Sequence, residues 1–233
     1  MTNRTFQGFS RDTVSFFHEL EENNERAWFE ANRERYQLEV VQPAQAFVLA
    51  MNEPLHSVYP GLQADPRPNG TGSIFRIHRD TRFSRDKRPY KTNLGIFFWH
   101  GWPGKRERPG YYVHLEGNSL ALYCGLYEFS SEKLLNYRRA VADPKRGARL
   151  ITAIETIQSA GAYTLGGHHY KRIPRGFEVP EERAELICFN TLYTMLETPI
   201  PAEFFSSRLV DYCIDHFTAM RPLLQWLVEE MMM

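Results

Sequence analysis

The spacing of apolar residues has a helical period in the first quarter of the chain. After Ser10, apolar side chains recur every three or four residues, which predicts a helix with Ser10 as its N-cap. Asn24 is expected to cap a second helix, and Pro43 to open a third. The sequence therefore predicts N-terminal helices over about residues 10–58.

From about residue 74 to 126 the period changes to two, the period of strands. Four runs alternate between apolar and polar residues: Ile74–Arg79, Asn93–His100, Gly110–Glu116 and Ser119–Gly125. Turn-forming residues between the last two runs predict a hairpin. Four neighbouring strands with short connections favour an antiparallel sheet.

Helical spacing returns over about residues 130–160 and 181–230. Phe189–Leu196 interrupts the second of these regions and is predicted to add a strand. The basic stretch 165–177 reads as an irregular loop, either a lid over the sheet or a plain exposed loop. Pro222 is expected to kink or split a long C-terminal helix.

These elements predict an α+β fold in a single globular domain over residues 1–233. We expect an antiparallel sheet of four or more strands, covered by helices from both ends of the chain. Aromatic residues form 14% of the sequence and supply a large core.

Targeting signals and cysteines bear on location. The N-terminus lacks the apolar run of a secretory signal, and the longest apolar stretch, Leu94–Trp99, is far shorter than the roughly 20 residues that span a bilayer. The three cysteines are widely spaced in apolar surroundings, as expected of buried, reduced thiols. We expect a cytoplasmic protein without membrane contact.

Charge is distributed unevenly although the formal net charge is zero. Residues 1–60 carry 5 basic and 9 acidic side chains, residues 61–177 carry 20 and 9, and residues 178–233 carry 3 and 10. A basic middle between acidic ends indicates either an anion-binding surface or internal pairing of the two signs. Both interpretations remain open at this point.

The basic character is concentrated in residues 75–91, FRIHRDTRFSRDKRPYK. The segment contains seven cationic side chains and two aspartates. Apolar residues lie between the charged ones, which indicates that the segment packs against the rest of the protein. Arginine forks suit phosphate and carboxylate oxygens, so anion binding and structural ion pairing are about equally supported. The residues expected to bind an anion are Arg76, Arg79, Arg82, Lys87, Tyr90, Lys91, Tyr112, His114, Lys171 and Arg172.

Alternation along the strands also assigns the two faces of the sheet. One face is expected to form the core, and it carries Phe75, Ile77, Leu94, Ile96, Phe98, Tyr111, Val113, Leu115, Leu120, Leu122 and Cys124. The opposite face mixes polar and aromatic groups around a glycine, as a ligand site does. It carries Arg76, His78, Asn93, Gly95, Phe97, Tyr112, His114, Glu116, Ala121 and Tyr123.

Asp80 and Glu116 are weak candidates for a catalytic base. His114 shares a face with Glu116, so the two side chains could reach one ligand. The alternative is that Glu116 pairs with Arg76 and that His114 is an ordinary surface residue.

No motif indicates a metal or a cofactor, because no zinc or iron spacing, phosphate loop or dinucleotide fingerprint occurs. Three functions therefore stay open. The first is a protein or enzyme that binds a small anion, and the second is a protein-interaction module without catalysis. The third, nucleic-acid binding, would add the cations Lys105, Arg106, Arg108 and those of 171–175, but no nucleic-acid-binding motif supports it. The sequence does not indicate an oligomeric state.

Several motifs resemble one known family. They are Asn23-Asn24 with the pattern Trp28-Phe29-x-x-Asn32-Arg33-x-x-Tyr36, the segment 75–91, PGYYVHL at 109–115 and KRIPRGF at 171–177. Together they resemble Domain of Unknown Function 2461, a family of uncharacterised proteins, from about Phe6 to Leu227. The resemblance implies one α+β domain and no established activity. His78 departs from the pattern, where a tyrosine or asparagine is expected.

Overall fold

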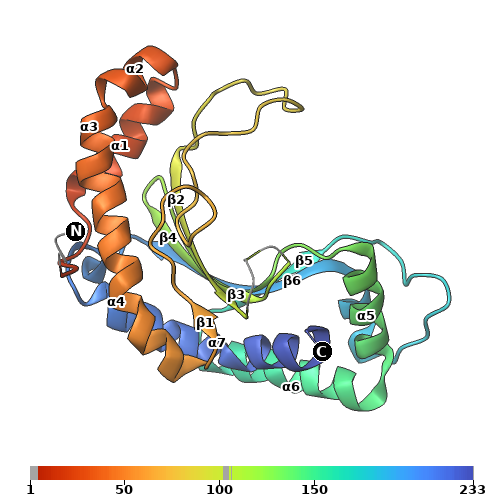
Figure 1. The fold of residues 1–233 in the computed structure, drawn as a ribbon. Helices are drawn as coiled ribbons and strands as arrows, with labels where there is room; N and C mark the ends of the chain where they lie inside the picture. The colour runs from red at the N-terminus through yellow and green to blue at the C-terminus, as the bar shows by residue number, and fades with distance from the viewer. Residues whose placement is uncertain (1–4, 102–104, 106, 233) are drawn as a thin grey trace. The chain divides into compact units, whose positions relative to one another are not determined.

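The structure, a computed structural model, describes residues 5–101, 105 and 107–232. Six antiparallel strands form one sheet in the order β1-β2-β3-β4-β6-β5, and helices precede and follow the strands along the chain (Figure 1). The predicted α+β class and antiparallel sheet are therefore confirmed.

Four of the six strands agree closely with runs predicted from the sequence, whereas β1 and β5 were not predicted. They are β1 (Leu62–Gln63), β2 (Asn93–His100), β3 (Gly110–Glu116), β4 (Ser119–Leu126), β5 (Thr164–His168) and β6 (Phe189–Pro199). The helices are α1 (Arg11–Glu22), α2 (Arg26–Ala31), α3 (Arg33–Tyr36), α4 (Gln42–Val58), α5 (Ser131–Ala142), α6 (Pro144–Ala160) and α7 (Leu209–Met231). A π-helical turn over Gln37–Val41 leads into α4.

Backbone contacts divide the chain into two compact units. The first comprises Met1–Phe98, Tyr112–Leu122 and Glu197–Asp215. The second comprises Trp99–Tyr111, Tyr123–Leu196 and His216–Met233.

An aromatic cluster forms the core of the first unit. Phe47 of α4 contacts Phe6, Phe9 and, across 6.2 Å between ring centroids, Phe98 of β2. Phe204 stacks on Phe9 with centroids 4.9 Å apart. All five rings are buried, so α4 covers this part of the sheet through an apolar contact.

Ser10 caps α1 as predicted. Its side chain accepts a hydrogen bond from the Thr13 backbone N–H at 3.1 Å and donates one to Glu39 Oε2 at 2.7 Å. The Thr13 hydroxyl donates to the Glu39 carbonyl oxygen at 2.6 Å, which satisfies a backbone acceptor within the π-helical turn. The capping role predicted for Asn24 is wrong, because Glu25 occupies the N-cap position of α2.

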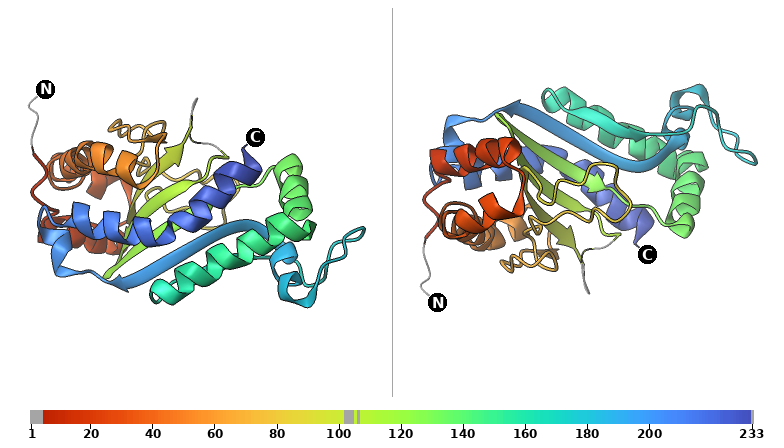
Figure 2. Two further views of the ribbon diagram at one scale, coloured as in Figure 1. Left: turned by 90° about the horizontal axis from the view of Figure 1, so that it is seen from below. Right: turned by 90° about the horizontal axis from the view of Figure 1, so that it is seen from above.

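The second unit is built on the last helices of the chain. Phe217 of α7 stacks on Tyr111 of β3 with centroids 4.3 Å apart, and the Tyr111 hydroxyl donates to the Phe217 carbonyl oxygen at 2.9 Å. Figure 2 shows the start of α6 beside the end of α7. Arg146 and Arg149 of α6 form ion pairs there with Glu230.

Four local predictions need correction. Ile74–Arg79 is not a strand but two isolated bridges, Ile74 to Ile96 and His78 to Tyr90. The stretch 165–177 is not wholly irregular, because β5 covers its first residues. The helix expected after Pro180 is two short 3₁₀ turns, and the split that the sequence allowed at Pro222 does not occur, because α7 is assigned through that residue.

The three cysteines lie in the interior of the protein. Cys124, Cys188 and Cys213 are buried free thiols, and burial raises the pKa of each. Within the described parts of the chain, no helix combines the length and apolar character needed to cross a bilayer.

Candidate functional site

The basic segment 75–91 lies in the first unit and is attached to the strands at defined points. The Phe75 backbone N–H donates to the Gly95 carbonyl oxygen at 3.0 Å, which holds the start of the segment against β2. Its two arms then bond to each other, with the Lys91 N–H donating to Ile77 O at 2.8 Å. The segment is thus a long hairpin-like loop whose base is hydrogen-bonded to β2.

Asn24 fixes the second arm of this loop. Its side-chain oxygen accepts from the Tyr90 N–H and its amide nitrogen donates to the Tyr90 carbonyl oxygen, both at 3.0 Å. The Tyr90 ring is buried and stacks on Phe29 of α2 with centroids 4.2 Å apart. Burial, and secondarily the charge of Glu30, raises the pKa of Tyr90. Tyr90 therefore anchors the loop to the helices.

Two aspartates within the segment bind three of its arginines. Asp86 accepts from Arg79 at 2.7 Å and from Arg88 at 2.9 Å, and Asp80 accepts from Arg82 at 2.7 Å. The Arg82 side-chain hydrogen bond lowers the pKa of Asp80 to about 2, and the Arg88 hydrogen bond is the largest cause that lowers the pKa of Asp86. A carboxyl group of such low pKa is a poor general base, so we do not place Asp80 in that role.

The remaining cations of the segment have no carboxylate partner among the described residues. Lys87 donates to the Thr81 carbonyl oxygen at 2.9 Å. Arg76, Arg85 and Lys91 form no ion pair within the described part of the chain, although the charge of Arg76 also acts on Asp80. The predicted internal pairing thus accounts for part of the segment only.

Lys91 is the least exposed of these unpaired cations. Its ammonium lies over the Phe75 ring, 5.3 Å from the centroid, which is within the range of a cation–π interaction. Burial, and after it the charge of Arg76, lowers the pKa of Lys91. Lys91 is therefore a partly desolvated cation, whereas Arg76 is exposed.

A row of polar side chains on β3 borders the same ring. Tyr112 contacts Phe75 edge-on, with centroids 5.7 Å apart, and its hydroxyl lies 3.1 Å from His114 Nδ1. His114 Nε2 in turn lies 3.3 Å from Glu116 Oε2. Glu116 therefore pairs with His114, and the alternative pairing of Glu116 with Arg76 does not occur. We call Phe75, Arg76, Lys91, Tyr112 and His114 the Lys91 cluster.

Gly95 allows Tyr112 to take this position. The glycine is buried in β2, and a Cβ there would overlap the Tyr112 hydroxyl oxygen. The predicted importance of a glycine on this face therefore has a physical basis: it admits a tyrosine ring rather than leaving an open cleft.

The other predicted site residues lie apart from this cluster. Arg79, Arg82 and Lys87 lie farther along the loop and bind the groups described above. Lys171 and Arg172 are exposed residues of the second unit, so their predicted part in the site remains a prediction. Arg106, one of the cations considered for nucleic-acid binding, lies outside the described residues.

Two features of the site were missed in the sequence. Phe75 was assigned to the core face but is only half-buried, and its ring contacts Lys91 and Tyr112. The tight pairing of Asn24 with the Tyr90 backbone connects positions 66 residues apart, and no local pattern reveals it. The alternation of residues 74–79 is typical of a strand. The chain nevertheless leaves β2 after Phe75, and residues 77–79 bond to the other arm of the loop.

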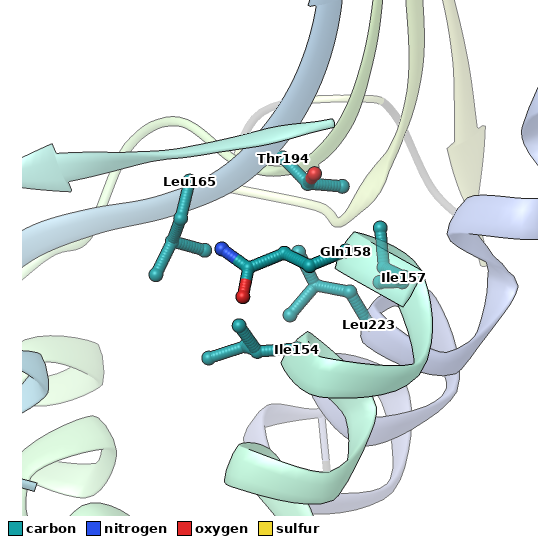
Figure 3. A pocket seen from close by; sticks show the side chains of 6 residues that line it. All are labelled: Ile154, Ile157, Gln158, Leu165, Thr194 and Leu223. Atoms are coloured by element: carbon teal, nitrogen blue, oxygen red, sulfur yellow. The ribbon is translucent and has the colours of Figure 1, made fainter. Parts of the chain in front are cut away.

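The second unit contains a recess, which Figure 3 shows between α6, β5, β6 and α7. Ile154, Ile157, Leu165 and Leu223 give it an apolar lining, and it has no room for a water molecule. It is a packing defect rather than a ligand site. Within the described residues, no three histidine, cysteine or acidic side chains are grouped so as to hold a metal ion.

Comparisons with known proteins agree with the motifs. The family described as a conserved hypothetical protein, DUF2461, matches residues 12–226. A comparison with curated proteins and one with solved structures each found no match. The matched range includes the basic segment, the β3 row and Asn24. The chain therefore belongs to the DUF2461 family.

Proposed function

We propose that this protein binds a small anionic ligand, one that carries a phosphate or carboxylate group, at the Lys91 cluster. The observation that supports this most directly is the pair of cations Lys91 and Arg76. Neither side chain forms an ion pair within the described part of the chain, and Lys91 is half-buried with its ammonium over the Phe75 ring. A cation that is partly removed from water without a counter-charge costs free energy, part of which a bound anion would recover.

The neighbouring groups suit such a ligand. Guanidinium and ammonium groups bind phosphate and carboxylate oxygens with short, charge-assisted hydrogen bonds. Phe75 supplies an apolar surface, and the Tyr112 hydroxyl and His114 supply hydrogen-bonding groups beside it. This mixture of one aromatic wall and a few convergent polar groups is typical of small-ligand sites.

Thermal unfolding with inorganic phosphate tests the proposal. At a phosphate concentration 100 times the dissociation constant, binding to the folded state adds about 2.7 kcal/mol. For a chain of this size that corresponds to roughly 5–10 °C in Tm. We expect Lys91→Ala and Arg76→Ala to abolish most of this shift.

The control variants are Arg85→Ala and Lys87→Ala, which remove cations of the same loop that lie outside the Lys91 cluster. They should leave the phosphate response intact. A response that is absent from the wild-type protein up to high millimolar phosphate would refute the proposal, and so would equal losses in all four variants.

A second candidate function is binding of an acidic protein partner by the tip of the loop. Phe83 is 95% exposed there, with the Arg82 guanidinium 5.8 Å from its ring centroid, and Arg85 and Lys87 are exposed nearby. Poly-L-glutamate serves as the probe. If the tip binds acidic chains, Phe83→Ser should weaken this binding several-fold; an unchanged affinity would remove this candidate.

A further inference from the structure

Three tyrosines of the second unit form a row of neighbouring rings. Tyr123 of β4 and Tyr193 of β6 have ring centroids 5.8 Å apart, and Tyr127, which follows β4 directly, lies 6.2 Å from Tyr193. Tyr127 is 80% exposed, and the other two side chains are partly exposed. We call these three residues the tyrosine row.

The tyrosine row lies on the face of the sheet that points away from α6 and α7. Leu165 of β5 and its partner Thr194 of β6 point toward these helices and line the recess between them (Figure 3). Because side chains alternate along a strand, the next pair, Gly166 and Tyr193, points the other way. A Cβ at Gly166 would overlap the Tyr193 ring, so the glycine provides room for that ring. The sheet therefore presents partly exposed aromatic rings on this face.

A basic loop, residues 168–175, begins two residues beyond Gly166. A strand rises roughly 3.3 Å per residue, so the loop starts no more than about 7 Å along β5 from the glycine that contacts the tyrosine row. Lys171, Arg172 and Arg175 of the loop are exposed. They form no ion pair within the described part of the chain, where the ion pairs of the second unit involve other cations. Their charge is therefore available to a partner.

Tyr170 continues the aromatic surface into this loop. Its ring is 36% exposed, and the guanidinium of Arg138 in α5 lies 4.8 Å from the ring centroid, which is within the range of a cation–π interaction. The backbone N–H groups of His169 and Tyr170 both donate to the Cys188 carbonyl oxygen, at 3.1 and 2.8 Å. These two hydrogen bonds fix the start of the loop, so the Tyr170 ring and the cations that follow it have a defined attachment to the second unit.

We propose that the tyrosine row and the 168–175 loop bind single-stranded nucleic acid. Bases of any identity stack on exposed aromatic rings, while lysine and arginine side chains neutralise the phosphates between them. The second unit supplies both kinds of group in sequence, from Tyr127 through Tyr193 and β5 to the loop. The site does not depend on the Lys91 cluster, because all of its residues belong to the second unit.

The arrangement favours a single strand over other anionic partners. A small anion is bound by a few convergent groups in a concave site, whereas these cations follow one another along an exposed loop. An acidic peptide would use the cations but has no bases to stack on the tyrosine row. Duplex DNA presents only the edges of its paired bases in the grooves, so the tyrosine rings could not stack on them.

Fluorescence anisotropy of the full chain with labelled oligothymidylate tests the inference. We expect saturable binding at low salt that weakens as salt is added. Tyr127→Ala should weaken binding about 5-fold or more, because one stacked base contributes on this scale, and should leave the salt dependence unchanged. The double variant Lys171→Ala/Arg172→Ala should reduce the slope of log affinity against log salt by about 1.4, since each phosphate contact of a single strand contributes roughly 0.7.

Two control variants and an abasic strand complete the experiment. Lys145→Ala removes an exposed cation of α6, and Phe83→Ser removes an exposed ring of the first unit; both should bind like the wild-type protein. An abasic strand of the same length keeps the phosphates but offers no bases, so it should bind more weakly than oligothymidylate.

Three results would overturn the inference: no binding at low salt, equal binding of the abasic strand, or a loss of affinity in Phe83→Ser instead of Tyr127→Ala. Poly-L-glutamate serves as a competitor of high negative charge without bases. If it displaced the labelled strand as effectively as unlabelled oligothymidylate does, the site would be one for acidic peptides and the inference would be wrong.

Discussion

At the scale of single residues, the basic segment separates into two kinds of cation. Arg79, Arg82 and Arg88 form ion pairs with aspartates two to seven positions away. These pairs stabilise the conformation of the loop. Arg76 and Lys91, at the base of the loop, have no such partner among the residues that the structure describes. The anion site that we propose depends on this second kind alone.

The carboxyl group of Asp80 should titrate with a pKa of about 2, because it accepts side-chain hydrogen bonds from Arg82. Since this value is below the ordinary 3.8, the stabilisation is complete above pH 3.8 and is lost as the pH falls through about 2. Carbon-detected NMR titration of the carboxyl group measures this. Arg82→Ala should raise the pKa toward 3.8, and Arg85→Ala should not; equal values in all three proteins would contradict the pairing.

Gly95→Ala should displace Tyr112, because the new methyl group would overlap the tyrosine hydroxyl. Overpacking of this kind costs about 1–3 kcal/mol of the free energy of unfolding, measured by urea denaturation. The double variant Gly95→Ala/Tyr112→Ala removes the overlap. Its cost should therefore be smaller than the sum of the two single costs; simple additivity would show that the two residues do not touch.

At the scale of elements, the loop depends on a helix connection far away in the sequence. Asn24, between α1 and α2, makes both of its described hydrogen bonds to the backbone of Tyr90. This link sets the path of the chain immediately before Lys91. The N-terminal helices therefore help to position the candidate site.

Asn24→Ala should lower the free energy of unfolding by about 2 kcal/mol, because two hydrogen bonds of about 1 kcal/mol each are lost. Urea denaturation provides the measurement. Asn23→Ala is the matched control, since the Asn23 side-chain amide donates to the Glu19 carbonyl oxygen on an exposed surface, and it should cost less. Equal losses of unfolding free energy in the two variants would contradict the role that we assign to the two Asn24–Tyr90 hydrogen bonds.

The regular strands were predictable, whereas the loop beside them was not. β2 and β3 have the predicted bounds because alternation over seven or eight residues reflects one buried face. Ile74–Arg79 alternates too, but residues 73–75 bond to β2 and residues 77–79 bond to the other arm of the loop. Alternation gives the period of a segment and does not identify its partner.

The strand β5 was not predicted, because two adjacent glycines lie within it. Gly167 in β5 has φ +119°, and a Cβ there would overlap the Thr191 carbonyl oxygen of the neighbouring strand. The pair Gly166-Gly167 permits a bulge in the pairing of β5 with β6, yet in a sequence it reads as a loop signal.

The candidate site was predictable in part. The segment 75–91 and the row Tyr112, His114 and Glu116 could be selected from charge and from shared strand faces. Which cations are already bound by aspartates depends on side-chain geometry in an irregular loop. No sequence period encodes that geometry.

At the scale of the whole molecule, the uneven distribution of charge has two explanations, each in its own unit. In the second unit, Arg146 and Arg149 pair with Glu229 and Glu230, so an acidic C-terminal end neutralises part of the basic middle. In the first unit, four cations of the basic segment have no acidic partner among the described residues: Arg76 and Lys91 at the base of the loop, and Arg85 and Lys87 nearer its tip. A net charge of zero conceals this difference.

The two acidic residues at the end of α7 should contribute unequally to stability. The Glu230 side chain is 8% exposed and contacts both arginines, whereas the Glu229 side chain is 35% exposed and contacts Arg149 alone among the arginines of α6. Glu230→Gln should therefore lower the free energy of unfolding by more than about 1 kcal/mol, and Glu229→Gln by less, because exposed pairs are screened. Denaturation at low and high salt measures both; a reversed order would contradict this arrangement.

The most direct test of the anion site is NMR of the ¹⁵N-labelled protein during titration with inorganic phosphate. Our account predicts saturable shifts with one common dissociation constant for the amides of Phe75, Arg76, Lys91 and Tyr112, and their loss in Lys91→Ala. Shifts that grow linearly and spread over exposed basic loops, or that persist unchanged in Lys91→Ala, would contradict it.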